Sequence, residues 1–173
     1  SILPGEEDVI QIDVADEQSG VPVAPEAVEE IVRLILQGEG IDEGEVSVAV
    51  VDDPTIHELN RQYLKHDYPT DVLAFLLDRR GARLEGEIVV SADTARAAAE
   101  RLGHEAGEEL SLYLAHGTLH LLGYDDRTAP QRDEMRRMER KYLAMAGITP
   151  RFEPSEADSQ AAASDPRPPA TDS

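Results

Sequence analysis

The chain of 173 residues contains no cysteine and no tryptophan. The absence of cysteine excludes disulfide bonds, thiolate zinc sites and cysteine nucleophiles, and it fits a reducing compartment. No apolar run approaches the roughly 18 residues that a membrane span needs, so we expect no membrane association. The first apolar residues, Ile2 and Leu3, are followed at once by Pro4, Gly5 and acids, unlike a secretory signal peptide. We therefore expect a cytoplasmic protein.

Basic residues are also scarce. Lysine and arginine total 16 against 36 acidic residues, the net charge is -20, and residues 1–30 contain no base. Because affinity for a phosphate backbone comes mainly from lysine and arginine, nucleic-acid binding by this chain must be local or assisted by a partner. One local candidate is a run of bases near the end of the folded part: Arg127, Arg132, Arg136, Arg137, Arg140 and Lys141.

Strand and helix patterns alternate along the chain. Residues 45–51 place a valine at every second position, as in a half-buried strand, and residues 25–37 place apolar residues at helical spacing before a glycine. The order βαβαββααα predicts an α+β (mixed α/β) fold with a four-stranded mixed sheet packed by helices. The strands are predicted at 9–14, 45–51, 71–77 and 86–91, and the helices at 25–37, from Asp53-Pro54 onward, 92–103, 106–122 and 129–146.

The helix at 106–122 is apolar nearly all round, so it is predicted to be central and buried. The helix after Pro54 is expected to bury Ile56, Leu59 and Tyr63. The last helix is expected to bury four side chains and to turn Arg132, Arg136 and Arg140 toward solvent. Those four are Met135, Met138, Tyr142 and Met145.

Two domain-level regions are predicted. Residues 1–149 form a single domain, and residues 150–173 form a disordered acidic tail. The tail holds five prolines among alanines, serines and acids, with Phe152 as its one large apolar residue. Such a composition does not bury enough apolar surface to offset the entropy of ordering.

The end of the central helix carries the strongest chemical signal, in His116, His120 and Asp126. Histidines four apart on a helix share a face, about 6 Å apart, and can hold one ion. Gly123 allows the chain to reverse and to return Asp126, or its neighbour Asp125, toward that face. Two imidazoles, a carboxylate and an open fourth position are typical of catalytic zinc. A histidine pair alone is better explained by hydrogen-bonded histidines in the core than by a metal.

The spacing H-x3-H-x5-[H/D], with a glycine three residues after the second histidine, is also the zinc-binding spacing of metzincin proteases. Those enzymes place a glutamate general base directly after the first histidine. Gly117 stands at that position here. The spacing is therefore compatible with a metal site, but the usual route of peptide hydrolysis is disfavoured.

Two stretches identify a family resemblance. The segment HGTLHLLGYDD (residues 116–126) resembles the HGxLHLxGYDH signature of the YbeY family, bacterial rRNA maturation factors described as metal-dependent endoribonucleases. Residues 59–63 and 67–75 are similar to the family's LNxxYRxxDxPTDVLSFP, and residues 86–88 to its GDI. The resemblance covers roughly residues 8–147 in matching order.

The chain departs from the family pattern at two positions. Asp126 stands where the family has its third metal histidine, and an aspartate ligand favours harder divalent ions than a histidine does. Leu64 stands where the family has an arginine thought to act on RNA, and leucine offers no charge to a developing anion. Lys65 and Arg61 are the neighbours that we consider as substitutes in substrate binding.

The resemblance implies a metal-dependent endoribonuclease acting on single-stranded RNA, in maturation of the 16S rRNA 3' end and in ribosome quality control. It implies one divalent ion, zinc by preference, and rRNA, ribosomal particles and a ribosomal protein as partners. No general base is identified from the sequence. A second hypothesis is a non-enzymatic ribosome-assembly factor with a weakened metal site, which Leu64 and Asp126 favour; a metalloprotease ranks third because of Gly117.

Other polar residues have plainer explanations. Asp67 and Asp71 flank Pro69-Thr70 and are expected to serve the turn, with lining of a metal cleft as the alternative. Asn60 is assigned with equal weight to a loop hydrogen bond or to the site. The three remaining histidines are expected at the surface: His57, His66 and His104.

Overall fold

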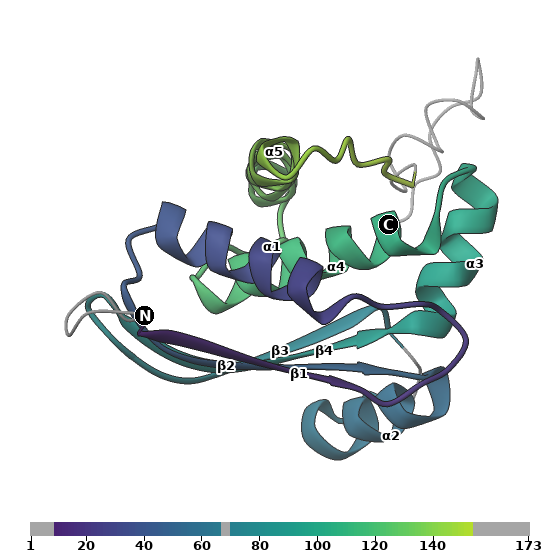
Figure 1. The fold of residues 1–173 in the computed structure, drawn as a ribbon, viewed down its shortest axis with the longest axis horizontal. Coiled ribbons are helices and arrows are strands. Elements are labelled where there is room, and N and C mark those ends of the chain that lie inside the picture. Colours follow the sequence, from purple (N-terminus) through teal and green to yellow (C-terminus); the bar gives the residue numbers. More distant parts are fainter. Residues whose placement is uncertain (1–8, 67–69, 154–173) are drawn as a thin grey trace, which may run out of the picture.

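The computed structural model describes residues 9–66 and 70–153. A four-stranded sheet lies at its centre, with the strands in the order β1-β2-β4-β3 (Figure 1). The strands are β1 (Ile10–Asp16), β2 (Glu43–Val51), β3 (Val72–Arg80) and β4 (Arg83–Ser91). Strands β1, β2 and β4 run parallel, whereas β3 runs antiparallel to β4 and forms an edge. The sheet is therefore mixed, as predicted.

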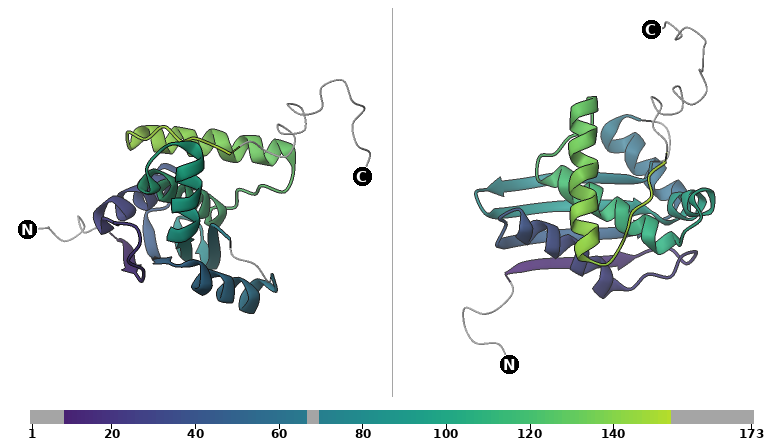
Figure 2. Two further views of the ribbon diagram at one scale, coloured as in Figure 1. Left: turned by 90° about the vertical axis from the view of Figure 1, so that its right-hand side faces the viewer. Right: turned by 90° about the horizontal axis from the view of Figure 1, so that it is seen from above.

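In the part of the chain that the structure describes, five helices surround this sheet. They are α1 (Pro25–Gly38), α2 (Asp53–Leu64), α3 (Ala92–Leu102), α4 (Ala106–Leu121) and α5 (Ala129–Met145). Helices α1 and α4 cover one face, and α2 lies on the other (Figure 1). Helix α5 packs on α4 and α1 and crosses above them, as both views in Figure 2 show. The predicted α+β class and element order are confirmed.

The main hydrophobic core lies between the sheet and the helices above it. Val46, Val48 and Val50 of β2 point into it and are each 1% exposed, while the residues between them are exposed or half-buried. This alternation follows from the two-residue period of a strand. A smaller apolar cluster lies under α2 on the opposite face, and it consists of Val51, Ile56, Leu73 and Val89.

Two glycines, one on α4 and one on β4, leave room for α4 to pack against the sheet. A Cβ at Gly117 of α4 would meet the Ile88 side chain at 2.9 Å, and one at Gly86 of β4 would meet Leu121 at 2.9 Å. With these two positions bare, α4 is seated against β4. Sixteen residues long and largely buried, α4 is the predicted central helix.

Two side chains predicted to be buried are exposed instead. Tyr63 is 64% exposed because α2 covers only the small second cluster, and its ring meets the edge of Phe75 at a centroid distance of 6.0 Å. Met145, at the last residue of α5, is 60% exposed, and Leu143 is buried in its place.

The packed part of the chain extends past the predicted boundary at residue 149. The Arg151 guanidinium donates to the carbonyl oxygens of Leu102 and Gly103 at 2.9 and 2.8 Å. Phe152 is half-buried against the main core, and Glu153 pairs with Arg101. The rest of the predicted tail, residues 154–173, lies outside the described residues. Among the described helices, none combines the length and apolar character that crossing a membrane requires.

Candidate metal centre

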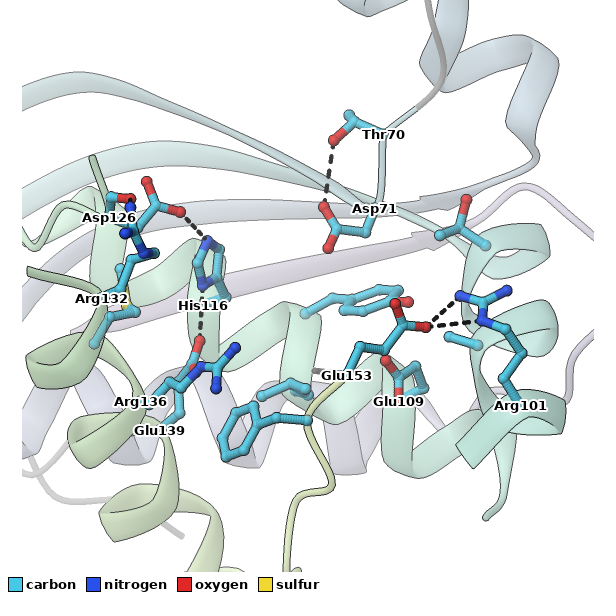
Figure 3. Close-up of a pocket in the computed structure, with 16 residues that line it drawn as sticks. Thr70, Asp71, Arg101, Glu109, His116, Asp126, Arg132, Arg136, Glu139 and Glu153 are labelled. Carbon is cyan, nitrogen blue, oxygen red and sulfur yellow. Dashed lines mark hydrogen bonds and ion pairs between the residues drawn. The ribbon is translucent and has the colours of Figure 1, made fainter. Parts of the chain in front are cut away.

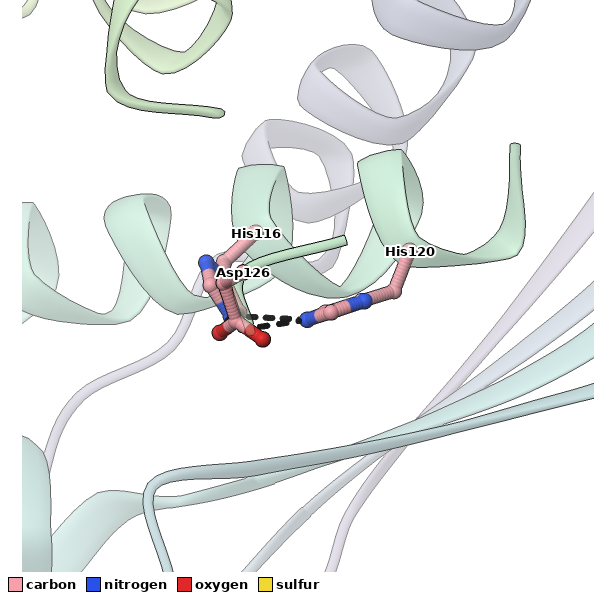
Figure 4. A group of neighbouring side chains, drawn as sticks. All are labelled: His116, His120 and Asp126. Carbon is pink, nitrogen blue, oxygen red and sulfur yellow. Dashed lines mark hydrogen bonds and ion pairs between the residues drawn. The ribbon is translucent and has the colours of Figure 1, made fainter. Parts of the chain in front are cut away.

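His116 and His120 lie one turn apart near the end of α4, and their rings project from the same side of the helix (Figure 4). The ring centroids are 4.5 Å apart and the Nε2 atoms 3.0 Å apart. The helical spacing thus brings two imidazole nitrogens together, as expected from the sequence. Both side chains are partly exposed, at 24% and 29%, so the pair remains accessible from outside.

A reversal after α4 brings the third residue to the pair. Gly123 adopts a φ of 101°, a conformation that favours glycine, and the Tyr124 amide donates to the Leu119 carbonyl at 3.0 Å. The chain then returns along α4, and the Asp126 Oδ2 atom lies 3.2 Å from His116 Nε2 and 3.5 Å from His120 Nε2. The structure therefore brings together all three residues that the sequence predicts as ligands.

The neighbouring Asp125 has a different place. Its Oδ1 accepts a hydrogen bond from the Asp126 amide at 2.8 Å, and its Oδ2 lies 3.3 Å from the Arg127 guanidinium. Asp125 therefore shapes the turn, and of the two adjacent aspartates it is Asp126 whose carboxylate faces the imidazoles.

The spacing of the three donor atoms fits one small divalent ion. Bonds of about 2.05 Å in a tetrahedral site separate any two ligand atoms by about 3.3 Å. The observed separations are 3.0 Å between the two Nε2 atoms, and 3.2 and 3.5 Å from these atoms to the Asp126 oxygen. Two neutral imidazoles and a carboxylate are also a donor set that binds zinc and related ions. The residues present thus fit a metal ion with its fourth position open.

A fourth residue, Glu139 of α5, completes the arrangement. Its Oε2 lies 2.7 Å from the Nδ1 atom of His116, and the side chain is 3% exposed (Figure 3). Metal-binding histidines commonly donate their second ring nitrogen to a carboxylate, which fixes the tautomer and the ring orientation. Glu139 therefore holds His116 with Nε2 directed at the candidate site.

The sequence analysis missed Glu139, although a signal was present. Positions 135, 138, 139 and 142 lie on one face of a helix. Met135, Met138 and Tyr142 of that face are buried as predicted, and Glu139 lies among them. A charged residue on an apolar helical face requires a buried partner. That partner is His116.

The carboxylates control protonation of the metal-free site. Burial lowers the pKa of His116, but hydrogen bonds to Asp126 and Glu139 outweigh it and raise the pKa to about 10. The hydrogen bond from His116 lowers the pKa of Asp126 to about 2, against the opposing effect of burial. Without a metal, these hydrogen bonds favour a protonated His116 at neutral pH, between two carboxylates. A divalent cation bound there takes the place of that positive charge.

Gly117 stands at the position where metalloproteases carry their glutamate general base. A Cβ there would meet side-chain atoms of Ile88 and Val72 at 2.9 and 3.0 Å. Gly117 thus faces the sheet instead of the site. A glutamate at this position would point toward the core, which also disfavours the usual route of peptide hydrolysis.

The turn that carries Asp126 is tied to α1. The Tyr124 hydroxyl donates to Glu39 Oε1 at 2.8 Å, and the Tyr142 hydroxyl donates to the other oxygen of the same carboxylate. Burial and the hydrogen bond to Glu39 raise the pKa of Tyr124 to about 12, so the phenol remains a donor. The carboxylate at the end of α1 thereby joins the turn to α5.

A cavity of about 490 Å³ opens beside the centre and is lined in part by His116, Asp126 and Glu139 (Figure 3). Thr70 and Asp71 line it as well, so Asp71 belongs to the cleft in addition to the turn, where its carbonyl accepts from the Ser91 amide at 2.9 Å. The turn explanation, favoured from the sequence, is therefore incomplete for Asp71. Asp67 lies outside the described residues.

The predicted substrate-binding residues of α2 are not part of this cavity wall. Arg61 forms an ion pair with Glu58, and Lys65 ends α2 with a φ of 63°. Leu64 is 43% exposed. Asn60 is 3% exposed, and its carbonyl accepts from the His66 amide at 3.2 Å. A role of Arg61 and Lys65 in substrate binding stays a prediction.

The other histidines separate into two groups. His66 is exposed and His57 half-buried, close to expectation. The His104 side chain is only 2% exposed, and its Nε2 lies 2.6 Å from a carboxylate oxygen of Glu109, so the predicted surface position is wrong. The reason is Glu109, a buried acid of α4 that requires a partner.

The fold and the centre together define an α+β protein with a three-ligand candidate metal site on its central helix, open to a cavity. A family model described as endoribonuclease YbeY matches residues 11–147. The chain therefore belongs to the YbeY family.

Individual relatives agree with this assignment. A Bacillus velezensis protein named endoribonuclease YbeY is 36% identical over 151 residues, which cover 80% of this chain and 96% of that protein. A Rhodopirellula baltica protein of the same name is 45% identical over 112 residues, which cover 64% of this chain and 58% of that relative, less than two thirds of its length. A solution structure from Thermotoga maritima is similar with a TM-score of 0.54 and 26% identity, over 79% of this chain and 92% of that chain.

Proposed function

We propose that this chain is a metal-dependent endoribonuclease that hydrolyses single-stranded RNA at His116, His120 and Asp126. The observation that carries the proposal is the convergence of three donor atoms at 3.0, 3.2 and 3.5 Å from one another, beside an open cavity. Membership of a family whose members are named endoribonucleases supports the reaction class. It also favours the enzyme over a non-enzymatic assembly factor.

Each residue of the proposed site has a separate role. With a metal bound, the Nε2 atoms of His116 and His120 would act as unprotonated donors and Asp126 would add one negative charge, while Glu139 would accept the Nδ1 proton of His116 in a hydrogen bond. These residues would hold a divalent ion, which would supply Lewis-acid chemistry toward a phosphoryl oxygen and toward water. The partly exposed Asp126 leaves the cavity side open for the scissile phosphate. Hydrolysis adds water across one P–O bond of the RNA chain.

We further propose that the resident ion is zinc, because imidazole nitrogens and a carboxylate at these separations match its preferred geometry. The substrate that we propose is the 16S rRNA 3' end within ribosomal particles, with a ribosomal protein as a docking partner and action in the cytoplasm. The net charge of -20 supports a requirement for such a partner, because the surface as a whole repels RNA.

The test combines metal analysis with cleavage. Purified parent protein and a His116→Ala variant are assayed for bound metal by elemental analysis and for cleavage of a labelled single-stranded RNA. We expect about one ion per parent chain and loss of both metal and cleavage in the variant. Metal without cleavage in the parent would support the assembly-factor hypothesis. Cleavage unchanged in His116→Ala would contradict the proposed site.

A further inference from the structure

The cavity beside the candidate metal centre is lined by three arginines, and they differ in their partners. Arg101 is paired with Glu153, and Arg132 donates to the carbonyl oxygens of Asp126 and Arg127 at 3.4 and 3.2 Å. Arg136 is half-buried and forms no hydrogen bond or ion pair with any residue of 9–66 or 70–153. It is thus the cation of this wall that is available for an anion from outside.

The position of Arg136 relates it to the centre. It lies one turn before Glu139 on α5, and Glu139 contacts His116 directly. Figure 3 shows both α5 side chains on the cavity wall below His116, with Arg132 further along toward Asp126. Arg136 is therefore placed to meet a second phosphate of an RNA strand that enters this cavity.

The guanidinium of Arg136 is held by an aromatic ring. Its Cζ atom lies 4.9 Å from the centroid of Phe152, and Arg140 contacts the same ring at 4.8 Å. A guanidinium stacked on a ring keeps its N–H groups, which lie in its own plane, free for a phosphate. Stacking also restricts the side chain before binding, which lowers the entropy lost when an anion is bound.

The ring itself is anchored on both sides. Arg151 donates to two carbonyl oxygens at the end of α3, and Glu153 pairs with Arg101 of the same helix. The short segment 151–153 therefore spans from α5 to α3 and fixes Phe152 between its anchors. In this way residues that the sequence analysis assigned to a disordered tail support the cavity wall.

We infer that Arg136 binds a phosphate of the RNA substrate and that Phe152 is a positioning residue for its guanidinium. The inference deepens the proposed function and rests on it. It also accounts for Leu64, which stands where the family has an arginine. The positive charge beside the centre comes instead from α5, on the opposite side of the sheet from α2.

The test compares Arg136→Gln with Arg137→Gln. Arg137 is the adjacent residue, exposed and paired with Glu134, and does not line the cavity, so it controls for the loss of one charge. The probe is a fluorescent single-stranded RNA with uncleavable linkages, titrated at several salt concentrations with metal content measured in parallel. We expect Arg136→Gln to bind about tenfold more weakly, with a salt slope reduced by about 0.7, at unchanged metal content. Arg137→Gln should match the parent.

Equal affinities for Arg136→Gln and Arg137→Gln would overturn the inference. For the ring, Phe152→Ala should weaken RNA binding by about threefold and raise KM more than it lowers kcat, and Phe152→Trp should restore the parent values. Failure of Phe152→Trp to do better than Phe152→Ala would overturn the positioning role. A parent that binds RNA through Arg136 and holds metal but does not cleave would refute the proposed function while leaving Arg136 as the phosphate-binding residue.

Discussion

The segments 116–126 and 59–75 both carry family motifs, but they differ in how their residues are packed and exposed. The first lies on a buried helix and a turn tied down by Tyr124, and its donor atoms converge within hydrogen-bonding distance. The second begins on the exposed end of α2, where Tyr63 and Leu64 are 64% and 43% exposed. Of the residues of this segment that the structure describes, Thr70 and Asp71 line the cavity. A motif marks kinship equally well in both places, but preorganised chemistry requires functional side chains held by packing, as they are at the end of α4.

Helix α5 provides a further contrast with α2. It carries no part of either motif, but contributes Glu139 behind His116 and Arg136 on the cavity wall. The site is therefore assembled from the end of α4, the turn after it and α5. The predictions below test this division between an organised region around α4 and α5 and a peripheral α2.

The largest expected effect is at His120. His120→Ala removes one of three donors, so we expect loss of bound metal and a fall in RNA cleavage on the order of a thousandfold. The control is His57→Gln on α2, which should keep its metal and cleave within about twofold of the parent. Elemental analysis and cleavage of a labelled RNA measure both. If His57→Gln lost as much metal and RNA cleavage as His120→Ala, the distinction between an organised region around α4 and α5 and a peripheral α2 would be wrong.

The second effect is at Glu139. Glu139→Gln keeps the shape but removes the charge that holds His116, and loss of such a partner costs about 10- to 100-fold in metal affinity. Glu134→Gln, on the outer side of the same helix and paired with Arg137, should leave metal affinity unchanged. Competition with a chromogenic chelator gives both values. Equal affinities would mean that Glu139 serves the packing of α5 alone.

The third effect is pH dependence of metal binding. The metal-free centre holds a proton at neutral pH because hydrogen bonds to Asp126 and Glu139 raise the pKa of His116 to about 10 against the effect of burial. A metal must displace that proton, so its affinity should rise about tenfold per pH unit between roughly pH 6 and 8. Calorimetry in buffers of different ionisation enthalpy should detect about one proton released per ion. Binding independent of pH would contradict a protonated His116 in the metal-free protein.

The fourth effect is smaller and concerns the family departure at position 126. Asp126→His restores the family's third histidine, so zinc affinity should stay the same or increase by up to about tenfold. Its control is Asp125→Asn, which alters the turn cap and not the donor set, and should keep the metal. A large loss of zinc in Asp126→His would show that Asp126 has a further structural partner in the turn.

These expectations show which parts of the site a sequence can predict. His116 and His120 were predictable because helical spacing alone puts them together, and Asp126 because Gly123 permits the reversal. Glu139 was not assigned to the site, and Arg136 was named only within a basic run expected to face solvent, because their proximity to His116 depends on how α5 packs across α4. The predicted burial of Tyr63 and Met145 was wrong for a related reason. Periodicity identifies the apolar face of a helix, but tertiary packing sets how much of that face is covered.

The smallest expected effect tests α2 directly. Arg61 is exposed and already paired with Glu58, and Lys65 is exposed at the end of the helix, so neither charge is directed at the cavity. Exposed, unconstrained charges contribute little to binding, and we expect Arg61→Ala and Lys65→Ala each to weaken RNA binding by about twofold or less. Affinity for the uncleavable RNA measures this, with Arg136→Gln as the reference for a cavity residue. A loss comparable to that of Arg136→Gln would show that the RNA path continues from the cavity onto α2.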